Sequence, residues 1–363
     1  MKDILCDISA FRAYRIPPQV LMLCPALPER NRGRNWKPFL KHILIEGAIG
    51  SPVHLVASQP SKRTGASTVA WHLIPEGIPP GHVADTPIGA SITAPELTLF
   101  QLAQSLPQAQ ALMAMYEFCG SFTVFEPSPR IECLLRESAD QGLLPPDFGW
   151  RRVRDDAGKP TSLWMRPPLT SPSDLLRFAR QIKGTRGARP FEQAARLVTG
   201  CAASPFEVQA SMLFSLPRSK GGEGFRGFTN NGKIPLSREA RFISGKTCCY
   251  ADISFGAAEG ITPLVIECQG KMVHNNFASA ISDADRIVAL QQMGYDVMPI
   301  TFGQIAKPNN FDVVRRIVAR KLGFSYREKT NTQVKRERKL REQLFMDWRH
   351  IGNRITGGSS RPR

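Results

Sequence analysis

Two acidic residues, Asp252 and Glu267, lie in neighbouring stretches of sequence that both predict β-strands. The first stretch, 247–255, reads TCCYADISF, and the second, 262–269, reads TPLVIECQ. If the chain turns at residues 259–260, the strands pair antiparallel and Asp252 lies opposite Glu267, with Cβ atoms roughly 5 Å apart. Two carboxylates this close repel each other unless a positive charge lies between them. Because Mg²⁺ prefers oxygen ligands and activates water for attack on a phosphodiester, we expect a Mg²⁺ (or Mn²⁺) site here.

Other residues with useful chemistry lie near this pair in the expected fold. Strand alternation places Gln269, and beyond it Lys271, on the same face as Glu267. His274 follows the strand and is a candidate proton carrier or phosphate contact. The expected helix that carries Glu207 precedes the two strands and offers a third carboxylate to the pair. Together with the family resemblance given below, this makes Glu207, Asp252, Glu267, Gln269 and His274 the candidate catalytic residues, and Asp252, Glu267 and Glu207 the candidate metal ligands.

Structural explanations exist for several of the same residues, and the sequence leaves them open. The spacing of Ser204 and Glu207 fits a capping box, in which the glutamate bonds the start of its own helix. Asp283 and Asp285 complement the N-terminus of another expected helix. Gln269 and Lys271 are equally compatible with a solvent-exposed position, and a lone histidine such as His274 is usually structural.

Regular patterns are clearest in the second half of the chain. We expect helices at 36–45, 94–104, 108–118, 173–181, 190–198, 204–216, 282–293 and 311–322, and strands at 53–57, 68–73, 247–255, 262–269 and 295–302. Residues 127–172 are broken by Pro and Gly, and 151–172 are the best candidate for a linker. We expect a small α+β domain at 1–150, which is a candidate DNA-binding domain, the linker at 151–172, a domain at 173–325 and a tail at 326–363.

The charge of the chain points to a polyanionic partner. Its 363 residues carry a formal net charge of +17, and DNA is the expected partner of so basic a chain. Residues 326–363 hold eleven basic and four acidic residues, and they include the segment VKRERKLREQLFMDW, which predicts a basic helix. This helix either packs with its polar face in solvent or contacts phosphates. The candidate nucleic-acid contacts are Lys271, Arg286, Lys335, Arg336, Arg338 and Lys339. Beyond Gly352 the composition predicts disorder.

Composition excludes several other classes of protein. Apolar residues make up 42% of the chain, enough for a globular core. The apolar runs are too short to cross a bilayer, and the start has no secretory signal pattern. The eight cysteines have no C-x-x-C spacing, so they are expected to be buried thiols of a cytoplasmic protein. No Gly-rich loop follows a strand, so we expect no nucleotide cofactor.

Residues 190–322 resemble the PD-(D/E)XK nuclease domain of bacterial endonucleases related to the very-short-patch repair enzymes. The resemblance rests on SPFE at 204–207, LPRSKGG at 216–222, YADISF at 250–255, VIECQGKMVH at 265–274, DADR at 283–286 and MGYDVMPIT at 293–301. It implies a restriction-endonuclease-like mixed sheet flanked by helices and a Mg²⁺-dependent site that cleaves DNA. The family's pattern of a helix glutamate, a strand aspartate and acid-x-lysine implies Glu207, Asp252, Glu267 and Gln269 as site residues. His274 and Asp283 match positions that often lie beside this site.

One departure from the pattern separates two functional hypotheses. Gln269 replaces the family's lysine, and glutamine neither carries positive charge nor moves a proton. The chain is therefore expected to be either an Mg²⁺-dependent DNA endonuclease or a DNA-binding, antitoxin-like regulator with an inactive nuclease fold. A nucleotide- or RNA-directed enzyme on the same fold is a third, weaker hypothesis. The second is supported by ITAPELTLFQLAQSL at 92–106, which is similar to a segment of AbiEi-type antitoxins, with DISAFRAYRIPP at 7–18 assigned to the same module.

Overall fold

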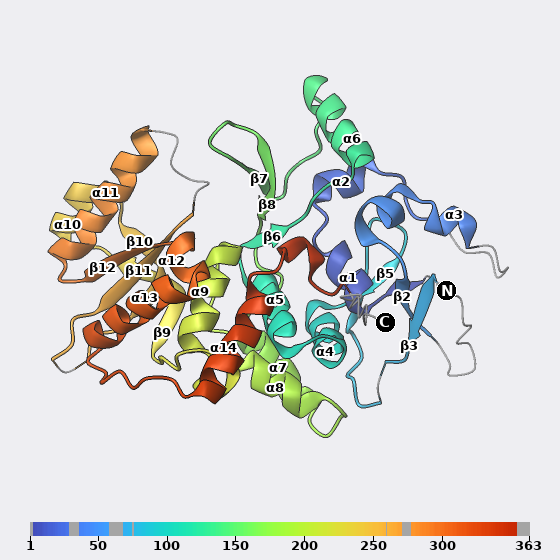
Figure 1. The fold of residues 1–363 in the computed structure, drawn as a ribbon. Coiled ribbons are helices and arrows are strands. Elements are labelled where there is room, and N and C mark those ends of the chain that lie inside the picture. The colour runs from blue at the N-terminus through green and yellow to red at the C-terminus, as the bar shows by residue number, and fades with distance from the viewer. Residues whose placement is uncertain are drawn as a thin grey trace, which may run out of the picture.

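The fold is α+β, with three β-sheets surrounded by helices (Figure 1). This computed structural model describes residues 3–28, 36–57, 68–74, 76–258, 260–270 and 277–353, with 277–283 described as backbone only. Among the described helices, none is both long and apolar enough to cross a membrane.

The first sheet is built from the N-terminal part of the chain. Its order is β3-β2-β1-β5-β4, and its strands are β1 (Ile4–Leu5), β2 (Val53–Val56), β3 (Val69–His72), β4 (Val83–Asp85) and β5 (Ser91–Thr93). The accompanying helices are α1 (Asp7–Ala13), α2 (Pro18–Leu23), α3 (Lys37–Leu40) and the π-helical turn η1 (Ile45–Ile49). The strands expected at 53–57 and 68–73 are confirmed as β2 and β3. The helix expected at 36–45 is only partly right, because the helical turn of α3 ends at Leu40.

The predicted linker at 151–172 is wrong. Residues 151–165 form β7 (Arg151–Arg154) and β8 (Pro160–Met165), and β8 pairs with β6 (Phe122–Val124) to make a three-stranded sheet of order β6-β8-β7. Trp164 of β8 is buried and donates from Nε1 to the carbonyl of Phe125 at 3.1 Å. The helix α6 (Pro129–Asp140), which the sequence did not predict, precedes the hairpin.

The predicted boundary at residue 150 does not separate two hydrophobic cores. Helices α4 (Pro95–Ser105) and α5 (Gln108–Cys119) pack against α7 (Pro172–Gln181), α8 (Ala188–Ala195) and α9 (Pro205–Ser215) in one cluster of buried residues. Phe100 of α4, for example, lies edge-on to Phe191 of α8, with ring centroids 5.8 Å apart. This cluster joins the two halves, while a second cluster lies at the N-terminal sheet and a third on the other face of the sheet that carries Asp252 and Glu267.

A mixed four-stranded sheet forms the part of the molecule that carries Asp252 and Glu267. Its order is β12-β11-β10-β9, with β9 (Phe228–Pro235), β10 (Cys248–Phe255), β11 (Leu264–Gln269) and β12 (Asp296–Thr301). Only β11 and β12 are parallel to each other. The helices α9 and α13 (Pro308–Lys321) pack on one face, and α10 (Arg238–Ser244) and α11 (Phe277–Gln292) pack on the other (Figure 1). The short helix α12 (Phe302–Ala306) joins β12 to α13.

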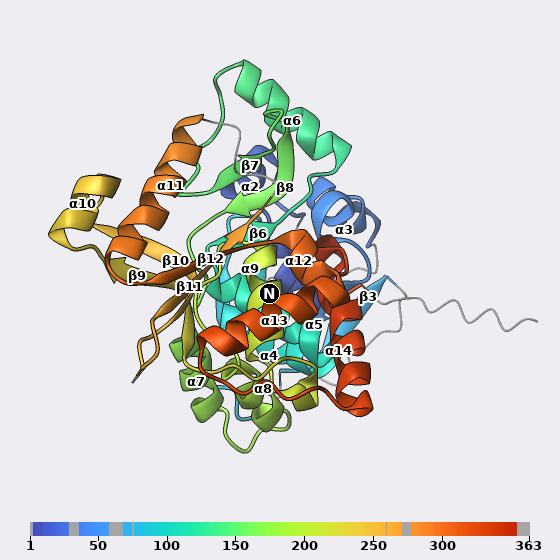
Figure 2. The same cartoon turned by 60° about the vertical axis from the view of Figure 1, so that its left-hand side comes forward.

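The basic tail forms α14 (Asn331–Leu344) and the 3-10 turn η4 (Trp348–His350), which lie against the rest of the protein (Figure 2). A buried ion network attaches this helix. Lys329 Nζ contacts Glu223 Oε1 at 2.5 Å and Glu337 Oε2 at 2.7 Å, and Arg315 lies 3.2 Å from Glu223. The tail is therefore an integral part of the fold up to Asn353, whereas the disorder expected further on lies outside the described residues.

Glu117 of α5 joins the beginning, middle and end of the chain. Its buried carboxylate accepts two hydrogen bonds from Arg15, at 2.8 and 2.6 Å, and one from the Thr123 hydroxyl at 2.6 Å. It also accepts a 2.6 Å bond from the indole nitrogen of Trp348. Burial raises the pKa of Glu117, but the charge of Arg15 and these hydrogen bonds outweigh burial and hold the pKa below its ordinary value.

We predict that Glu117→Gln lowers the free energy of unfolding at pH 7 by about 3–5 kcal/mol, because a buried ion pair loses one partner. A group with a depressed folded-state pKa stabilises above its ordinary pKa of 4.5 and loses that contribution as the pH falls through the folded-state pKa. The difference between wild type and variant should therefore shrink below about pH 4.5. Urea unfolding at several pH values measures it. Glu126→Gln, which alters an exposed pair with Arg349, should cost less than about 1 kcal/mol, and an equal loss in both variants would contradict the prediction.

Candidate active site

The antiparallel strands β10 and β11 bring Asp252 and Glu267 to neighbouring positions. Ile253 pairs with Ile266, Ser254 with Val265 and Phe255 with Leu264, and Asp252 and Glu267 are the residues that follow the Ile253–Ile266 pair on the two strands. The ladder pairs end at Ile253, and beyond them the Asp252 carboxylate accepts a hydrogen bond from the Cys268 amide at 2.7 Å. This bond holds the Asp252 carboxylate beside β11, at the residue that follows Glu267 in the chain. The antiparallel pairing of the two strands is as expected, but the described ladder does not include the predicted direct pair of Asp252 and Glu267.

Asn230 of β9, which the sequence analysis missed, fixes the backbone beneath Asp252. Its side-chain amide donates to the Asp252 carbonyl at 3.0 Å and to the Ser211 hydroxyl at 2.6 Å. Its amide oxygen accepts from the Thr199 hydroxyl at 2.5 Å. Because Ser211 belongs to α9, this buried asparagine ties β10 to the helix that carries Glu207.

Glu207 caps its helix, but not through the capping box that the sequence predicted, because its carboxylate bonds the Ala203 amide and not the Ser204 amide. It lies in the first turn of α9, where its carboxylate accepts from the Ala203 amide at 2.7 Å and from the Ser204 hydroxyl at 2.9 Å. Burial, followed by the negative charges of Asp252 and Glu267, raises its pKa to about 8. Glu207 therefore stabilises the start of its helix and also lies within electrostatic reach of the two strand acids.

Arg286 of α11 provides positive charge at this site. Its guanidinium contacts Glu267 Oε2 at 2.8 Å and donates to the Tyr250 carbonyl at 3.3 Å. The sequence analysis assigned Arg286 to nucleic-acid contact, whereas the structure places it against a candidate metal ligand. The DADR motif at 283–286 indicated that Arg286 lies near the site, but nothing in the sequence indicated its ion pair with Glu267.

The other predicted site residues are only partly placed. Gln269 is exposed at the end of β11, two residues beyond Glu267 and on the same face of the strand, and it pairs with Thr301 of β12. Lys271 and His274 lie outside the described residues. Asp283 belongs to α11, but its side chain is not described.

The three acids fit a hard divalent cation by their chemistry and their electrostatics. Carboxylate oxygens are the ligands that Mg²⁺ prefers. The negative charges of Asp252 and Glu267 repel that of Glu207, and a bound cation would offset this repulsion. Their oxygens do not all lie within 4.8 Å of one another. Metal binding by all three therefore requires a rearrangement of their side chains, for which release of Glu267 from Arg286 is the simplest route.

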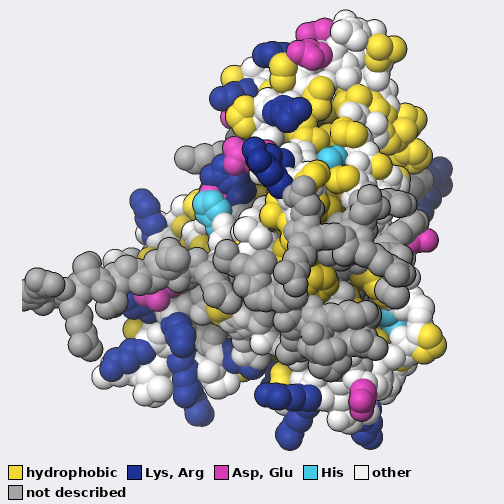
Figure 3. All heavy atoms as spheres, turned by 90° about the vertical axis from the view of Figure 1, so that its right-hand side faces the viewer, with side chains coloured by type: hydrophobic (Ala, Val, Ile, Leu, Met, Phe, Trp, Pro, Cys, Tyr) yellow, Lys and Arg dark blue, Asp and Glu magenta, His cyan; other side chains and the backbone are white. Residues whose placement is uncertain are grey.

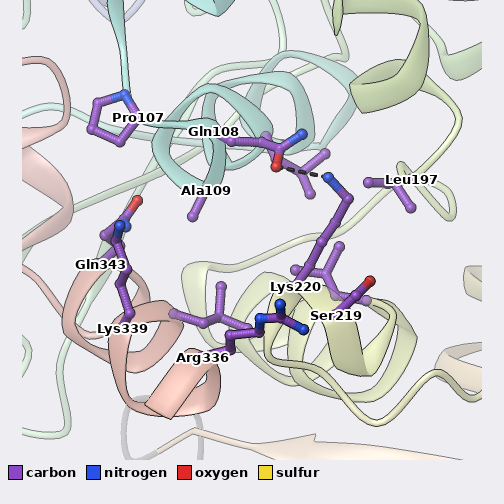
Figure 4. Close-up of a pocket in the computed structure, with 12 residues that line it drawn as sticks. Pro107, Gln108, Ala109, Leu197, Ser219, Lys220, Arg336, Lys339 and Gln343 are labelled. Carbon is purple, nitrogen blue, oxygen red and sulfur yellow. Dashed lines mark hydrogen bonds between the residues drawn. The ribbon is translucent and has the colours of Figure 1, made fainter. Parts of the chain in front are cut away.

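A second basic feature is a pocket between α5, α14 and the 3-10 turn η3 (Arg218–Lys220). Its volume is about 440 Å³, and Lys220, Arg336 and Lys339 contribute its positive charge. Figure 4 shows Lys220 reaching across to Gln108, with its Nζ 2.7 Å from Oε1, while Arg336 extends toward Ser219. Of the predicted tail contacts, Lys335, Arg336, Arg338 and Lys339 are all exposed on α14, whereas Leu340 and Leu344 of the same helix are buried. The helix thus both packs and presents a basic face.

We predict that Arg286→Ala increases the stabilisation of the protein by divalent metal ions. Without the guanidinium, Glu267 loses its counter-charge in the metal-free fold, and a cation at the acids no longer competes with Arg286 for this carboxylate. Mn²⁺ should then raise the melting temperature of the variant more than that of the wild type in thermal scans against EDTA. The matched control is Arg238→Ala, an exposed arginine on α10. Equal metal-induced shifts in all three proteins would contradict competition between Arg286 and a metal.

The functional assignment rests on the residues of this chain, because comparisons with known proteins found no match. No family model, no curated protein and no solved structure matches this chain.

Proposed function

We propose that this protein hydrolyses phosphodiester bonds of DNA at the site formed by Asp252, Glu267 and Glu207, with a bound Mg²⁺ or Mn²⁺. The observation that carries the proposal is the convergence of two acids on neighbouring strands and a third, buried helix acid whose pKa is raised by burial and by the charges of the other two. A carboxylate with a perturbed pKa beside other acids is typical of catalytic sites.

The architecture around the acids supports a restriction-endonuclease-like fold. A mixed four-stranded sheet carries Asp252 and Glu267 on adjacent antiparallel strands, and the helix bearing Glu207 packs on one face of that sheet. This is the arrangement that the resemblance to the PD-(D/E)XK nucleases implies. The resemblance and the bacterial origin that it suggests remain part of the proposal.

Each residue of the site has a definite task in this proposal. Asp252 and Glu267 hold the cation, and Glu207 supports it from the start of α9. When bound, the cation polarises the phosphodiester and activates a water. Gln269 orients water by hydrogen bonding but cannot accept its proton, so the proton passes to solvent. Arg286, once released from Glu267, offers its positive charge to a substrate phosphate.

DNA is the proposed substrate because the chain is basic overall and along a defined surface. The net charge is +17, and the pocket beside α14 presents three basic side chains from two elements. Lys and Arg side chains are also more common than Asp and Glu on the face shown in Figure 3. Such a distribution attracts a phosphate backbone irrespective of sequence.

The alternative is a DNA-binding, antitoxin-like regulator whose nuclease fold is inactive. Two observations favour it, the glutamine at position 269 and the ion pair between Arg286 and Glu267. A regulator of this kind binds DNA in a salt-sensitive manner but leaves it intact, so cleavage separates the two functions.

We expect the purified chain to nick supercoiled plasmid DNA in Mg²⁺ or Mn²⁺ and not in EDTA. Asp252→Asn and Glu267→Gln should each lower the rate by more than about 100-fold, since even residues that support metal ligands contribute 10- to 100-fold. Glu239→Gln removes an exposed acid on the nearby α10 and should leave the rate unchanged. Gel assays measure the nicked fraction with time. Intact plasmid with both metals, or full activity in either site variant, would refute hydrolysis at this site.

We also expect the basic pocket to contribute to DNA affinity. Replacing Lys220, Arg336 and Lys339 with Gln should weaken binding, and the slope of log K against log salt should fall by about 1 for each phosphate that the variant no longer neutralises. Fluorescence anisotropy at several salt concentrations measures the slope. The charge-matched control replaces Arg180, Lys183 and Arg189, which are exposed on or next to α7 and α8, with Gln. The same weakening in both triple variants would show that binding follows net charge and not this pocket.

A further inference from the structure

Asp7, His54 and His72 come together at the N-terminal sheet, far from the acids of β10 and β11 in the sequence. Asp7 is the first residue of α1 and follows the central strand β1. In the parallel pair β2 and β3, His54 pairs with Ala70 and His72 pairs with Val56. The two histidines are therefore diagonal neighbours on one face of the sheet.

The ring nitrogens and the carboxylate form a compact set of ligand atoms. Asp7 Oδ2 lies 3.8 Å from His54 Nδ1 and 3.7 Å from His72 Nδ1, and the two rings approach within 2.9 Å through His72 Nε2 and His54 Nδ1. In a tetrahedral zinc site with the usual bond lengths, neighbouring ligand atoms are separated by roughly 3.3 Å. Within the described ranges, no other three His, Cys, Asp or Glu residues bring their ligand atoms within 4.8 Å of one another.

Helix α4 holds the aspartate in position. The Ser105 hydroxyl donates to Asp7 Oδ1 at 3.0 Å, while the other oxygen, Oδ2, is the one near the rings. The Asp7 amide donates to Gln101 Oε1 at 2.9 Å, and the residue has a φ of 49°, in the left-handed region that aspartate tolerates better than most residues. Outer hydrogen bonds of this kind orient the carboxylates of metal sites.

The burial of the three side chains suits an ion that reaches the site from solvent. The Asp7 side chain is 5% exposed, whereas His54 and His72 are 18% and 29% exposed. The carboxylate thus lies at the bottom, and the imidazoles form the accessible side. Three protein ligands leave a fourth position of a tetrahedron to water.

We propose that Asp7, His54 and His72 bind a divalent transition metal ion, of which Zn²⁺ is the best match. Two imidazoles and one carboxylate suit Zn²⁺, Co²⁺ and Ni²⁺, whereas Mg²⁺ prefers oxygen ligands only. The site is independent of the proposed nuclease site, which consists of carboxylates. A bound ion links α1 to β2 and β3 and stabilises the N-terminal sheet, because it binds the folded chain.

The test is a titration of the full-length, chelator-treated protein with Co²⁺ in excess Mg²⁺, which saturates the carboxylate site. We expect one equivalent of Co²⁺ to give the visible absorption of a tetrahedral site, without the near-ultraviolet band of thiolate ligation, and Zn²⁺ to displace it. His54→Ala and His72→Ala should each weaken binding by more than about 100-fold. His350→Ala, which removes an exposed histidine near the end of the described chain, should bind as the wild type does.

A further variant covers the case in which the histidine variants do not fold. Ser105→Ala keeps all three ligands but removes the bond to Asp7 Oδ1, and it should weaken Co²⁺ binding by about 10- to 100-fold. The proposal is overturned if the wild type shows no tetrahedral absorption, if folded His54 and His72 variants bind equally well, or if Ser105→Ala has no effect. Plasmid cleavage is measured separately, so either proposal can fail without the other.

Discussion

A carboxylate buried without a counter-charge is costly, and this constraint divides the buried glutamates of the chain into two kinds. Glu117 and Glu223 are surrounded by cations and hydrogen-bond donors that join distant segments, from Arg15 to Trp348 and from Arg315 to Lys329. Glu207 instead faces two other acids, and its pKa rises where that of Glu117 falls. The first kind holds the fold together. The second, Glu207, retains its proton near neutral pH, and a cation bound beside it would favour its ionised form.

The ion pair between Glu267 and Arg286 meets part of that requirement within the protein itself. Its position explains how a cluster of acids is tolerated in a buried part of the sheet without a metal. It also makes metal binding a competition, because the cation and the guanidinium seek the same carboxylate. Under the proposed function, metal binding and hydrolysis therefore depend on whether Glu267 can be released from Arg286, as well as on the glutamine at position 269.

Helices and strands with clear caps and apolar periodicity could be predicted from the sequence. Those that form only because a distant strand pairs with them could not. Helices α4, α5, α7 and α9 begin at Pro or at a capping Ser and carry apolar faces, and each lies within a few residues of its expected range. Strand β9, FTNNGKIP, contains a turn-like Asn-Asn-Gly and exists because β10 pairs with it. Pro160 and the prolines that follow it predict a loop in place of the hairpin of β7 and β8. In the structure, Pro160 lies at the first position of β8, where a strand tolerates proline.

The candidate sites differ in the same way. Asp252 and Glu267 could be brought together from the sequence because two strands joined by a short turn leave little choice of register. Asn230 and Arg286 come from elements whose placement depends on tertiary packing, so their contacts were not predicted. Asp7, His54 and His72 are more distant still, because β2 and β3 are parallel and their register is set by the sheet and not by a turn. A single histidine in a short strand does not by itself indicate metal binding, and its neighbours are known only once the sheet is folded.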